Sequence, residues 1–195
     1  MKNEIEARLL NVDVEQFIKE LRRNNAEFIG DWLQIRYCYD FNPVQENSWI
    51  RLRTNGKETT LTIKEIQNRN IDGTKESEIV VSDFKTTDEI LNKLGYVVRS
   101  KQENRRIRFK LDNVEIDIDF WPKIPTYVEF EAESEEEIKK VCERLNIEFN
   151  DLVTLDVMSI YKFYSYDMFK LPSTLLLEEE RKTSYSEILD QNLNL

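Results

Sequence analysis

Residues 49–65 read WIRLRTNGKETTLTIKE, and this stretch decides the fold class. In its first half Arg51 and Arg53 alternate with apolar residues, and the second half keeps the same period of two. That period is typical of a β-strand, whose successive side chains point to opposite faces, whereas a helix has a period of 3.6. Asn55-Gly56, between the halves, is a strong turn signal. The stretch therefore predicts a β-hairpin with strands at 49–54 and 59–65.

The same alternation returns along the chain, and each occurrence carries mostly one sign of charge. On a solvent-exposed sheet face, which is the alternative interpretation, cross-strand pairing favours opposite charges and mixed polar residues. Here the chain instead repeats doublets, meaning two residues of the same charge two positions apart. They predict that one sheet face gathers carboxylates and guanidiniums into a charged cavity. The doublets are Glu4/Glu6, Arg51/Arg53, Glu76/Glu78, Arg106/Arg108, Asp117/Asp119 and Glu129/Glu131, with Arg8 and Lys64 at equivalent positions.

Further strands are predicted at residues 3–10, 32–40, 75–82, 96–111, 114–121 and 127–132. Helical spacing predicts three helices: one over 13–25 that begins with Asp13 and Gln16, one after Thr87, and one after Ser134 and Glu137. Gly95 is expected to end the second helix. The side chains expected to be buried on the second and third helices are Ile90, Leu91, Leu94, Ile138, Val141, Cys142 and Leu145.

The C-terminal part of the chain has a weaker pattern. The aromatic stretch IYKFYSYDMF is expected to pack as a helix or a strand, and the tail from Leu171 as an amphipathic, partly mobile appendage. We therefore expect one domain over residues 1–170, with 171–195 as its C-terminal appendage.

Composition limits the classes of function. The chain has 195 residues, of which 40% are hydrophobic and 34% charged, and its formal net charge is −10. That charge argues against binding to a nucleic-acid backbone or an anionic membrane, since both need a basic field. An acidic start, no apolar run of roughly 18 residues, and the isolated Cys38 and Cys142 predict a cytoplasmic protein with reduced thiols. Because histidine is absent, a general base must be a carboxylate, a lysine or metal-bound water.

The charge of the expected cavity indicates its chemistry. Its eight carboxylates and six cations leave a net charge of −2. The carboxylates would repel a polyphosphate unless divalent cations bound to their oxygens bridged to it, while arginine forks bound the remaining phosphate oxygens. The sequence therefore predicts Mg²⁺ or Mn²⁺ as the cofactor and attack on a phosphorus atom as the reaction.

In chain order, these residues resemble the motifs of the CYTH superfamily, also called triphosphate tunnel metalloenzymes. Glu4-Ile5-Glu6-Ala7-Arg8 is similar to the family's ExExK motif, Trp49-Ile50-Arg51-Leu52-Arg53 to its LRLR strand, and Thr60-Leu61-Thr62-Ile63-Lys64 to its TLTxK strand. The other matching segments are Tyr39-Asp40 for YYD, Glu76 and Glu78 for ExE, Gly95 to Phe109 for LGF…KxR…Y, and Asp119 with Glu129-Phe130-Glu131 for D…ExE. The resemblance covers residues 1–145.

The resemblance implies an α+β fold with a closed, eight-stranded antiparallel β-tunnel, charged side chains inside it and helices outside. The residues implied as catalytic are Glu4, Glu6, Glu129, Glu131 and Lys64. Those expected to bind the triphosphate are Arg8, Arg51, Arg53, Lys64 and Arg106, with Arg108 added from strand parity alone. Those expected to bind metal are Glu4, Glu6, Asp119, Glu129 and Glu131, with support from Glu76 and Glu78.

The leading hypothesis is metal-dependent hydrolysis of inorganic tripolyphosphate or of a nucleoside or thiamine triphosphate. The alternatives are a class IV adenylyl cyclase, which converts ATP to cyclic AMP and pyrophosphate, and a non-catalytic binding module. Arg8 and Asn104 stand where the family motif has lysine, which leaves the substrate open. A base or thiazole ring could stack on Trp49, Tyr37, Tyr39 or Trp121. The expected partner is a triphosphate-containing small molecule, without nucleic acid or membrane, and a homodimer is left open.

Overall fold

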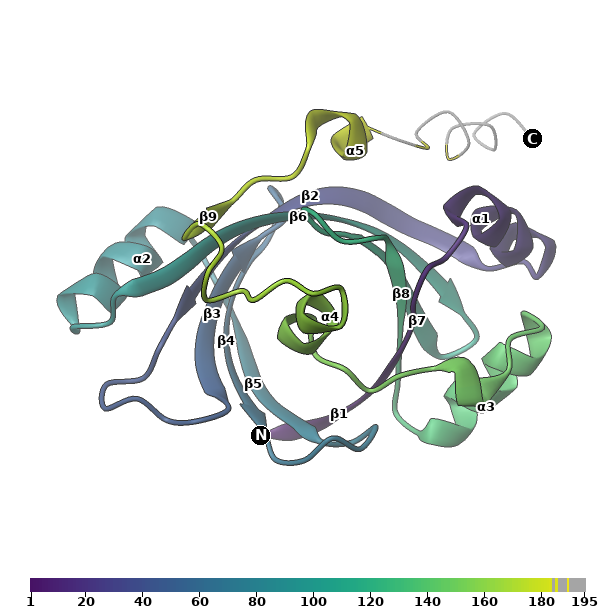
Figure 1. The fold of residues 1–195 in the computed structure, drawn as a ribbon, viewed down its shortest axis with the longest axis horizontal. Helices are drawn as coiled ribbons and strands as arrows, with labels where there is room; N and C mark the ends of the chain where they lie inside the picture. Colours follow the sequence, from purple (N-terminus) through teal and green to yellow (C-terminus); the bar gives the residue numbers. More distant parts are fainter. Residues whose placement is uncertain (184, 186–188, 190–195) are drawn as a thin grey trace.

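The computed structural model describes residues 1–183, 185 and 189, and it shows a closed β-barrel (Figure 1). Eight strands follow the order β2-β3-β4-β5-β1-β8-β7-β6, and β2 also pairs with β6, which closes the ring. All these pairs are antiparallel, so the predicted α+β barrel is confirmed. The strands are β1 (Lys2–Leu9), β2 (Glu27–Tyr39), β3 (Ser48–Thr54), β4 (Thr59–Ile66), β5 (Thr74–Val81), β6 (Val98–Leu111), β7 (Val114–Phe120) and β8 (Tyr127–Ala132).

Strands β3 and β4 form the predicted hairpin. Their register runs from Ser48 opposite Glu65 to Thr54 opposite Thr59. Gly56 in the connecting turn has φ +83, a left-handed conformation that glycine adopts without steric cost. Because the register fixes which side chains share a face, Arg51 and Arg53 both lie on the inner face of the barrel, where they line its cavity.

Apolar side chains of the strands face outward and are covered by helices. Helix α1 (Val14–Arg23) and helix α3 (Glu135–Arg144) pack on one side of the barrel, and α2 (Phe84–Lys93) packs on another (Figure 1). The rings of Phe17 and Phe130 meet edge to face, with 6.4 Å between their centroids. The barrel is therefore inverted relative to a soluble barrel with an apolar interior, since its hydrophobic cores lie between the strands and the outer helices.

The helix predictions are confirmed for α1 and α3 and need correction for α2. Asp13 accepts a hydrogen bond from the backbone N–H of Gln16 at the start of α1, and Ser134 opens α3 in the same way. Helix α2 begins after Asp83, and not at Thr87, because the Asp83 carboxylate accepts from the N–H of Thr86. Of the three residues expected to be buried on α2, only Leu91 is buried, and Ile90 and Leu94 are exposed. Gly95 does follow the helix with positive φ.

Strand β2 begins five residues earlier than the predicted range of 32–40. Its extension pairs with β6 through a register shift between Phe28 and Gly30. Such an irregularity interrupts simple alternation, and the pattern in the sequence does not reveal strand pairing there. The longer β2 matters for the site because its pairing with β6 closes the barrel.

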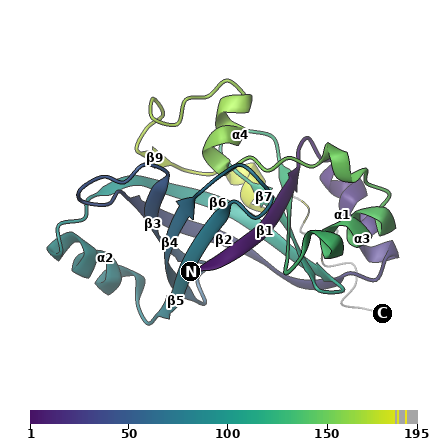
Figure 2. The same ribbon diagram turned by 90° about the horizontal axis from the view of Figure 1, so that it is seen from below.

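The chain beyond β8 and α3 crosses one end of the barrel. A 3₁₀ turn (Phe149–Asp151) leads to α4 (Val157–Phe163), which lies over the ring of strands in Figure 1 and at one end of the barrel in Figure 2. The chain then adds the short parallel strand β9 (Thr174–Leu175) to β6 and forms α5 (Glu179–Thr183). The aromatic stretch thus contains a helix. Part of the expected appendage, 184, 186–188 and 190–195, lies outside the described residues. No helix in the described part of the chain combines the length and apolar character needed to span a membrane.

Candidate functional site

The barrel encloses a cavity of about 490 Å³, and residues of α4 contribute to its lining. Strands β1 to β8 contribute polar or charged side chains to its wall, and residues of the segment 156–175 line its mouth. All thirteen residues proposed from the sequence as catalytic, substrate-binding or metal-binding lie in this one wall. They are Glu4, Glu6, Arg8, Arg51, Arg53, Lys64, Glu76, Glu78, Arg106, Arg108, Asp119, Glu129 and Glu131.

One side of the cavity carries an excess of guanidinium groups. Arg51 and Arg53 lie 3.2 and 3.5 Å from the same carboxylate oxygen of Glu78. Arg36 of β2 stands directly opposite Arg53 in the sheet register. Repulsion from Arg51, together with burial, lowers the pKa of Arg53 to about 8. The positive charge of this side therefore exceeds the negative charge that the chain places next to it.

Another side of the cavity carries an excess of carboxylates. Glu131 of β8 stands opposite Glu6 of β1 and opposite Glu115 of β7. Among the described residues Glu131 has no ion-pair partner. Burial, followed by repulsion from Glu129 and Glu6, raises the pKa of Glu131 to about 7. A cation bound there would remove this repulsion.

Ion pairs connect the two kinds of charge elsewhere in the wall. Lys64 Nζ lies 2.7 Å from Glu4 and 3.3 Å from Glu76. Burial raises the pKa of Glu4 to about 8, against the opposing effect of Lys64. Lys64 is thus held by two carboxylates and sits where it can contact a bound anion.

Arg8 joins β1 to β8 and to the segment before α4. Its Nη2 lies 2.8 Å from Glu6 and 2.6 Å from Glu129, and its Nη1 donates to the carbonyl oxygen of Leu155 at 2.9 Å. Burial alone would raise the pKa of Glu129, but Arg8 and Arg106 outweigh it and lower this pKa. Arg8 therefore binds carboxylates and also fixes the chain at the mouth of the cavity.

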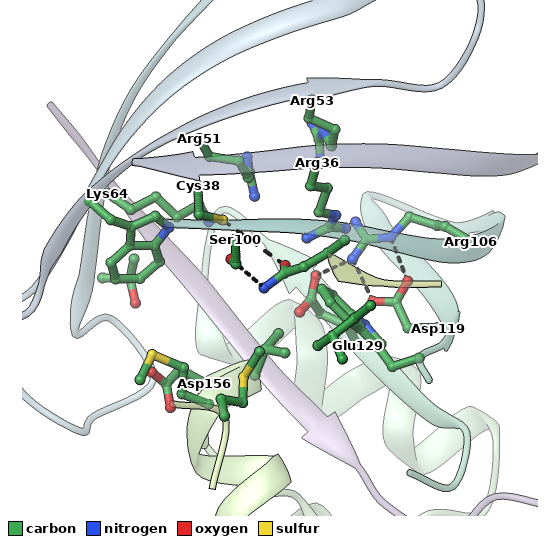
Figure 3. A pocket seen from close by; sticks show the side chains of 18 of the residues that line it. Arg36, Cys38, Arg51, Arg53, Lys64, Ser100, Arg106, Asp119, Glu129 and Asp156 are labelled. Atoms are coloured by element: carbon green, nitrogen blue, oxygen red, sulfur yellow. Dashed lines mark hydrogen bonds and ion pairs between the residues drawn. The ribbon is translucent and has the colours of Figure 1, made fainter. Parts of the chain in front are cut away.

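Arg106 is enclosed by three carboxylates. It makes a bidentate contact with Asp119, at 2.8 and 2.6 Å, and lies 3.0 Å from Glu129 (Figure 3). It also lies 2.5 Å from Asp117. Asp117 also pairs with Arg108 at 2.7 Å, and it is buried and is not among the residues that line the cavity. Asp117 therefore holds the two arginines in place without lining the cavity itself.

The predicted metal ligands share the cavity but do not converge on one point. The described residues contain no group of three or more His, Cys, Asp or Glu side chains placed to hold a metal ion. The physical reason is that these carboxylates already pair with cations of the protein: Glu4 with Lys64, and both Glu6 and Glu129 with Arg8. The donor set still fits a divalent cation, because the uncompensated Glu131 stands opposite two other carboxylates, and hard oxygens are the ligands that Mg²⁺ and Mn²⁺ prefer.

Two of the four aromatic residues considered for ring stacking lie in the cavity wall. Trp49 and Trp121 line it. Tyr37 packs instead on Phe84 of α2, at 4.9 Å between ring centroids, and Tyr39 donates its hydroxyl hydrogen to Asp88 at 2.7 Å. Both tyrosines contact the helix outside the barrel, and neither lines the cavity, so the stacking hypothesis does not hold for them.

Several residues of the wall, above all Arg36, were not predicted from the sequence. Arg36 shares the inner face of β2 with Cys38, and the alternation of residues 34–38 would have placed it there. It was missed because it is a single charge and not part of a doublet. The other missed lining residues that carry charge or a phenol are Arg99, Glu115, Tyr127 and Asp156. Asn104, which stands where the family motif has lysine, is fully buried, and neither of its amide atoms has a partner in the described structure.

The fold and its interior define a class of protein: a closed antiparallel β-tunnel with ion pairs in the bore and hydrophobic cores outside it. The chain belongs to the CYTH domain family, whose model matches residues 3–164. The family includes triphosphatases and adenylyl cyclases. A comparison with curated proteins finds no match.

Solved structures share the fold at low sequence identity. The PH1012 protein of Pyrococcus horikoshii OT3 is 22% identical with a TM-score of 0.69, over 80% of this chain and 98% of that chain. A Vibrio parahaemolyticus protein named as a candidate adenylate cyclase is 14% identical with a TM-score of 0.69, over 83% and 98%. HpAC1 of Hippeastrum is 15% identical with a TM-score of 0.60, over 89% and 99%. These similarities support the fold.

Proposed function

We propose that the tunnel binds a triphosphate and hydrolyses it with the help of a divalent metal ion. The observation that carries this proposal is the separation of charge inside one cavity. Arg36, Arg51 and Arg53 lack enough carboxylates on one side, while Glu131 lacks a cation on the other. A polyanion and a metal ion bound together would compensate both excesses.

The cations suit a chain of phosphates. A guanidinium presents a planar fork of N–H donors that matches two phosphate oxygens, and Arg51 and Arg53 present two such forks two residues apart on β3. Lys64 lies on the adjacent strand β4, directly opposite Trp49 of β3. These groups would hold a linear anion along the wall and stabilise the negative charge that develops as a P–O bond breaks.

The carboxylates suit the metal. In this proposal Glu4, Glu6, Glu129 and Glu131 hold Mg²⁺ or Mn²⁺, with Asp119, Glu76 and Glu78 in support. The ion would supply Lewis-acid stabilisation of the negative charge on the phosphate oxygens. Arg8 orients this group, because it contacts both Glu6 and Glu129. The segment around α4 lies at one end of the barrel (Figure 2) and contributes residues to the lining, so it would limit the access of bulk water to the cavity.

One of the solved structures with this fold supports hydrolysis. HpAC1 of Hippeastrum is described as having a dominant triphosphatase activity, and it shares this fold. We therefore place hydrolysis first.

An adenylyl cyclase is the second candidate, and a specific observation favours it. The mouth of the cavity has an apolar lining that inorganic tripolyphosphate does not need, formed by Trp49, Met158, Met168 and Phe169. A nucleoside could lie against these side chains while its phosphates enter the charged part. The candidate adenylate cyclase of Vibrio parahaemolyticus shares the fold.

Phosphate release and cyclic nucleotide formation distinguish these functions. The protein is incubated with tripolyphosphate, ATP or thiamine triphosphate, with Mg²⁺ or Mn²⁺ or with a chelator. Metal-dependent orthophosphate without cyclic AMP supports hydrolysis, and cyclic AMP with pyrophosphate supports the cyclase. Tight binding without either product would make the domain a binding module and would refute the proposed hydrolysis.

A matched pair of variants tests whether the carboxylates are responsible. Glu131→Gln removes one charge from the cavity, and Glu133→Gln removes one charge from an exposed position two residues later. We expect Glu131→Gln to lose at least tenfold in metal-dependent turnover and Glu133→Gln to keep the wild-type rate. Equal rates for both variants would remove Glu131 from the site.

A further inference from the structure

Arg36 differs from every other cation in the cavity wall. Within the described part of the chain, the remaining cations that line the cavity each make an ion pair, and Arg36 makes none. The residue is 6% exposed, and its Nε has no hydrogen-bond partner in the described part of the chain. An unpaired buried guanidinium is costly, so its position needs an explanation.

Neutral groups hold Arg36 in place. Its Nη2 donates to Gln34 Oε1 at 2.7 Å, and its guanidinium carbon lies 4.8 Å from the centre of the Trp121 ring. Both contacts orient the group, and neither neutralises its charge. In Figure 3, Arg36 points into the cavity beside Arg51, with Glu129 and Asp119 across from it.

The cross-strand neighbour of Arg36 is another arginine, which makes the position of the Arg36 guanidinium less stable. Arg36 of β2 and Arg53 of β3 stand directly opposite one another. Like charges in such a pair repel, and both residues are largely buried. Burial, Arg51 and Arg106 lower the pKa of Arg36 to about 10, which shows that its surroundings disfavour the cation. Within the cavity, a bound anion would relieve that repulsion.

We propose that Arg36 is a phosphate-binding residue of the tunnel, oriented by Gln34 and Trp121, which shares a phosphate group with Arg53. This inference rests on the proposed function, since it assumes that a triphosphate enters the cavity. It also explains how the site tolerates Asn104: Gln34 stands opposite Asn104 in the register, and Arg36 lies two residues further along the same face of β2. The positive charge that the family motif has at the position of Asn104 on β6 would thus come from Arg36 on β2.

The test measures binding separately from turnover. Tripolyphosphate is titrated calorimetrically into the full chain in the presence of a chelator, so that no hydrolysis occurs, and thermal unfolding of the same ligand-free samples is recorded. The variants are Arg36→Met, which keeps an unbranched side chain without charge, and Arg36→Lys, which keeps the charge without the fork. Arg23→Met is the control, because Arg23 is exposed on α1 and its loss changes the net charge equally.

We expect Arg36→Met to weaken binding of tripolyphosphate about 10- to 100-fold, as for the loss of a charge-assisted hydrogen bond. The ligand-free Tm should not fall, since the repulsion with Arg53 is removed. Arg36→Lys should retain part of the affinity, and Arg23→Met should match the wild type. An unchanged Kd for Arg36→Met, or a loss of affinity that is matched by a lower ligand-free Tm, would overturn the inference.

Two further outcomes are decisive. If Arg36→Met fails to fold, Arg36→Lys carries the test, and wild-type affinity in that variant would refute a role for the fork. If the wild-type protein does not bind tripolyphosphate in the presence of the chelator, the same variants are compared by their KM in metal-dependent phosphate release, where Arg36→Met should raise the KM and Arg23→Met should not. The proposed function fails if the wild-type protein shows neither binding nor turnover; if the wild-type protein binds or turns over and Arg36→Met does so equally well, only the role of Arg36 fails.

Discussion

Glu131→Gln should stabilise the metal-free protein, although it removes a residue of the proposed site. In the unfolded chain this carboxyl has its ordinary pKa of 4.5, and in the folded protein burial and the neighbouring Glu129 and Glu6 raise the pKa to about 7. Between these values the folded state binds more protons than the unfolded state, so stability falls as the pH rises from 4.5 to 7. A shift of about 2.5 pKa units corresponds to about 3 kcal/mol lost above pH 7.

Glutamine imitates the protonated carboxyl and cannot ionise, so the variant should avoid this loss. The gain should be close to zero near pH 4.5 and reach about 3 kcal/mol near pH 8, which for a chain of this length is a Tm increase of about 6–12 °C. Calorimetric unfolding at both pH values, in the presence of a chelator, measures it, with Glu133→Gln as the control. A Tm difference that is the same at both pH values, or a destabilised variant at pH 8, would refute the electrostatic reasoning.

Three further variants test other parts of the wall. Arg106→Met should lower the free energy of unfolding by about 3–5 kcal/mol in denaturant titrations, because it leaves buried carboxylates without their cation; a loss below about 1 kcal/mol would contradict the buried ion-pair network. Arg53→Met should weaken tripolyphosphate binding by about 1.5–3 kcal/mol in calorimetry without lowering the Tm, and an unchanged affinity would exclude Arg53 from the site. Glu6→Gln should abolish metal-dependent phosphate release with little change in Tm, since Arg8 keeps Glu129 as a partner; normal turnover would remove Glu6 from the proposed metal site.

The sequence predicted the barrel well because the inverted alternation is a strong signal. A doublet such as Arg51 and Arg53 reveals both the strand and the face that is polar, so the residues of the wall could be named before their contacts were known. The pattern could not show pairing between strands. That is why the early start of β2 was missed, whereas Arg36 was overlooked because it is a single charge outside any doublet.

The predictions that failed depend on tertiary contacts. Ile90 and Leu94 follow helical spacing, but α2 covers only a small area of the barrel, so that Leu91 alone is buried on it. Tyr37 and Tyr39 alternate with inward residues and therefore face this same helix. Periodicity assigns a residue to a face of its own element, and the neighbouring element then decides what that face contacts.

The two charge excesses in the wall have a consequence for binding. Repulsion among Arg36, Arg51 and Arg53 destabilises the ligand-free protein on one side of the cavity. Repulsion around Glu131 destabilises it on the other side. A polyanion relieves the first and a divalent cation the second, and each would also attract the other across the same cavity. Their binding should therefore be positively coupled, so that Mn²⁺ tightens tripolyphosphate binding by the same factor as tripolyphosphate tightens Mn²⁺ binding. Calorimetric titrations in both orders measure that factor in the wild-type protein, with the slowly hydrolysed imido analogue of tripolyphosphate as the anion. A factor of one in both orders would mean that the two clusters act independently, and that charge separation in the bore has another cause.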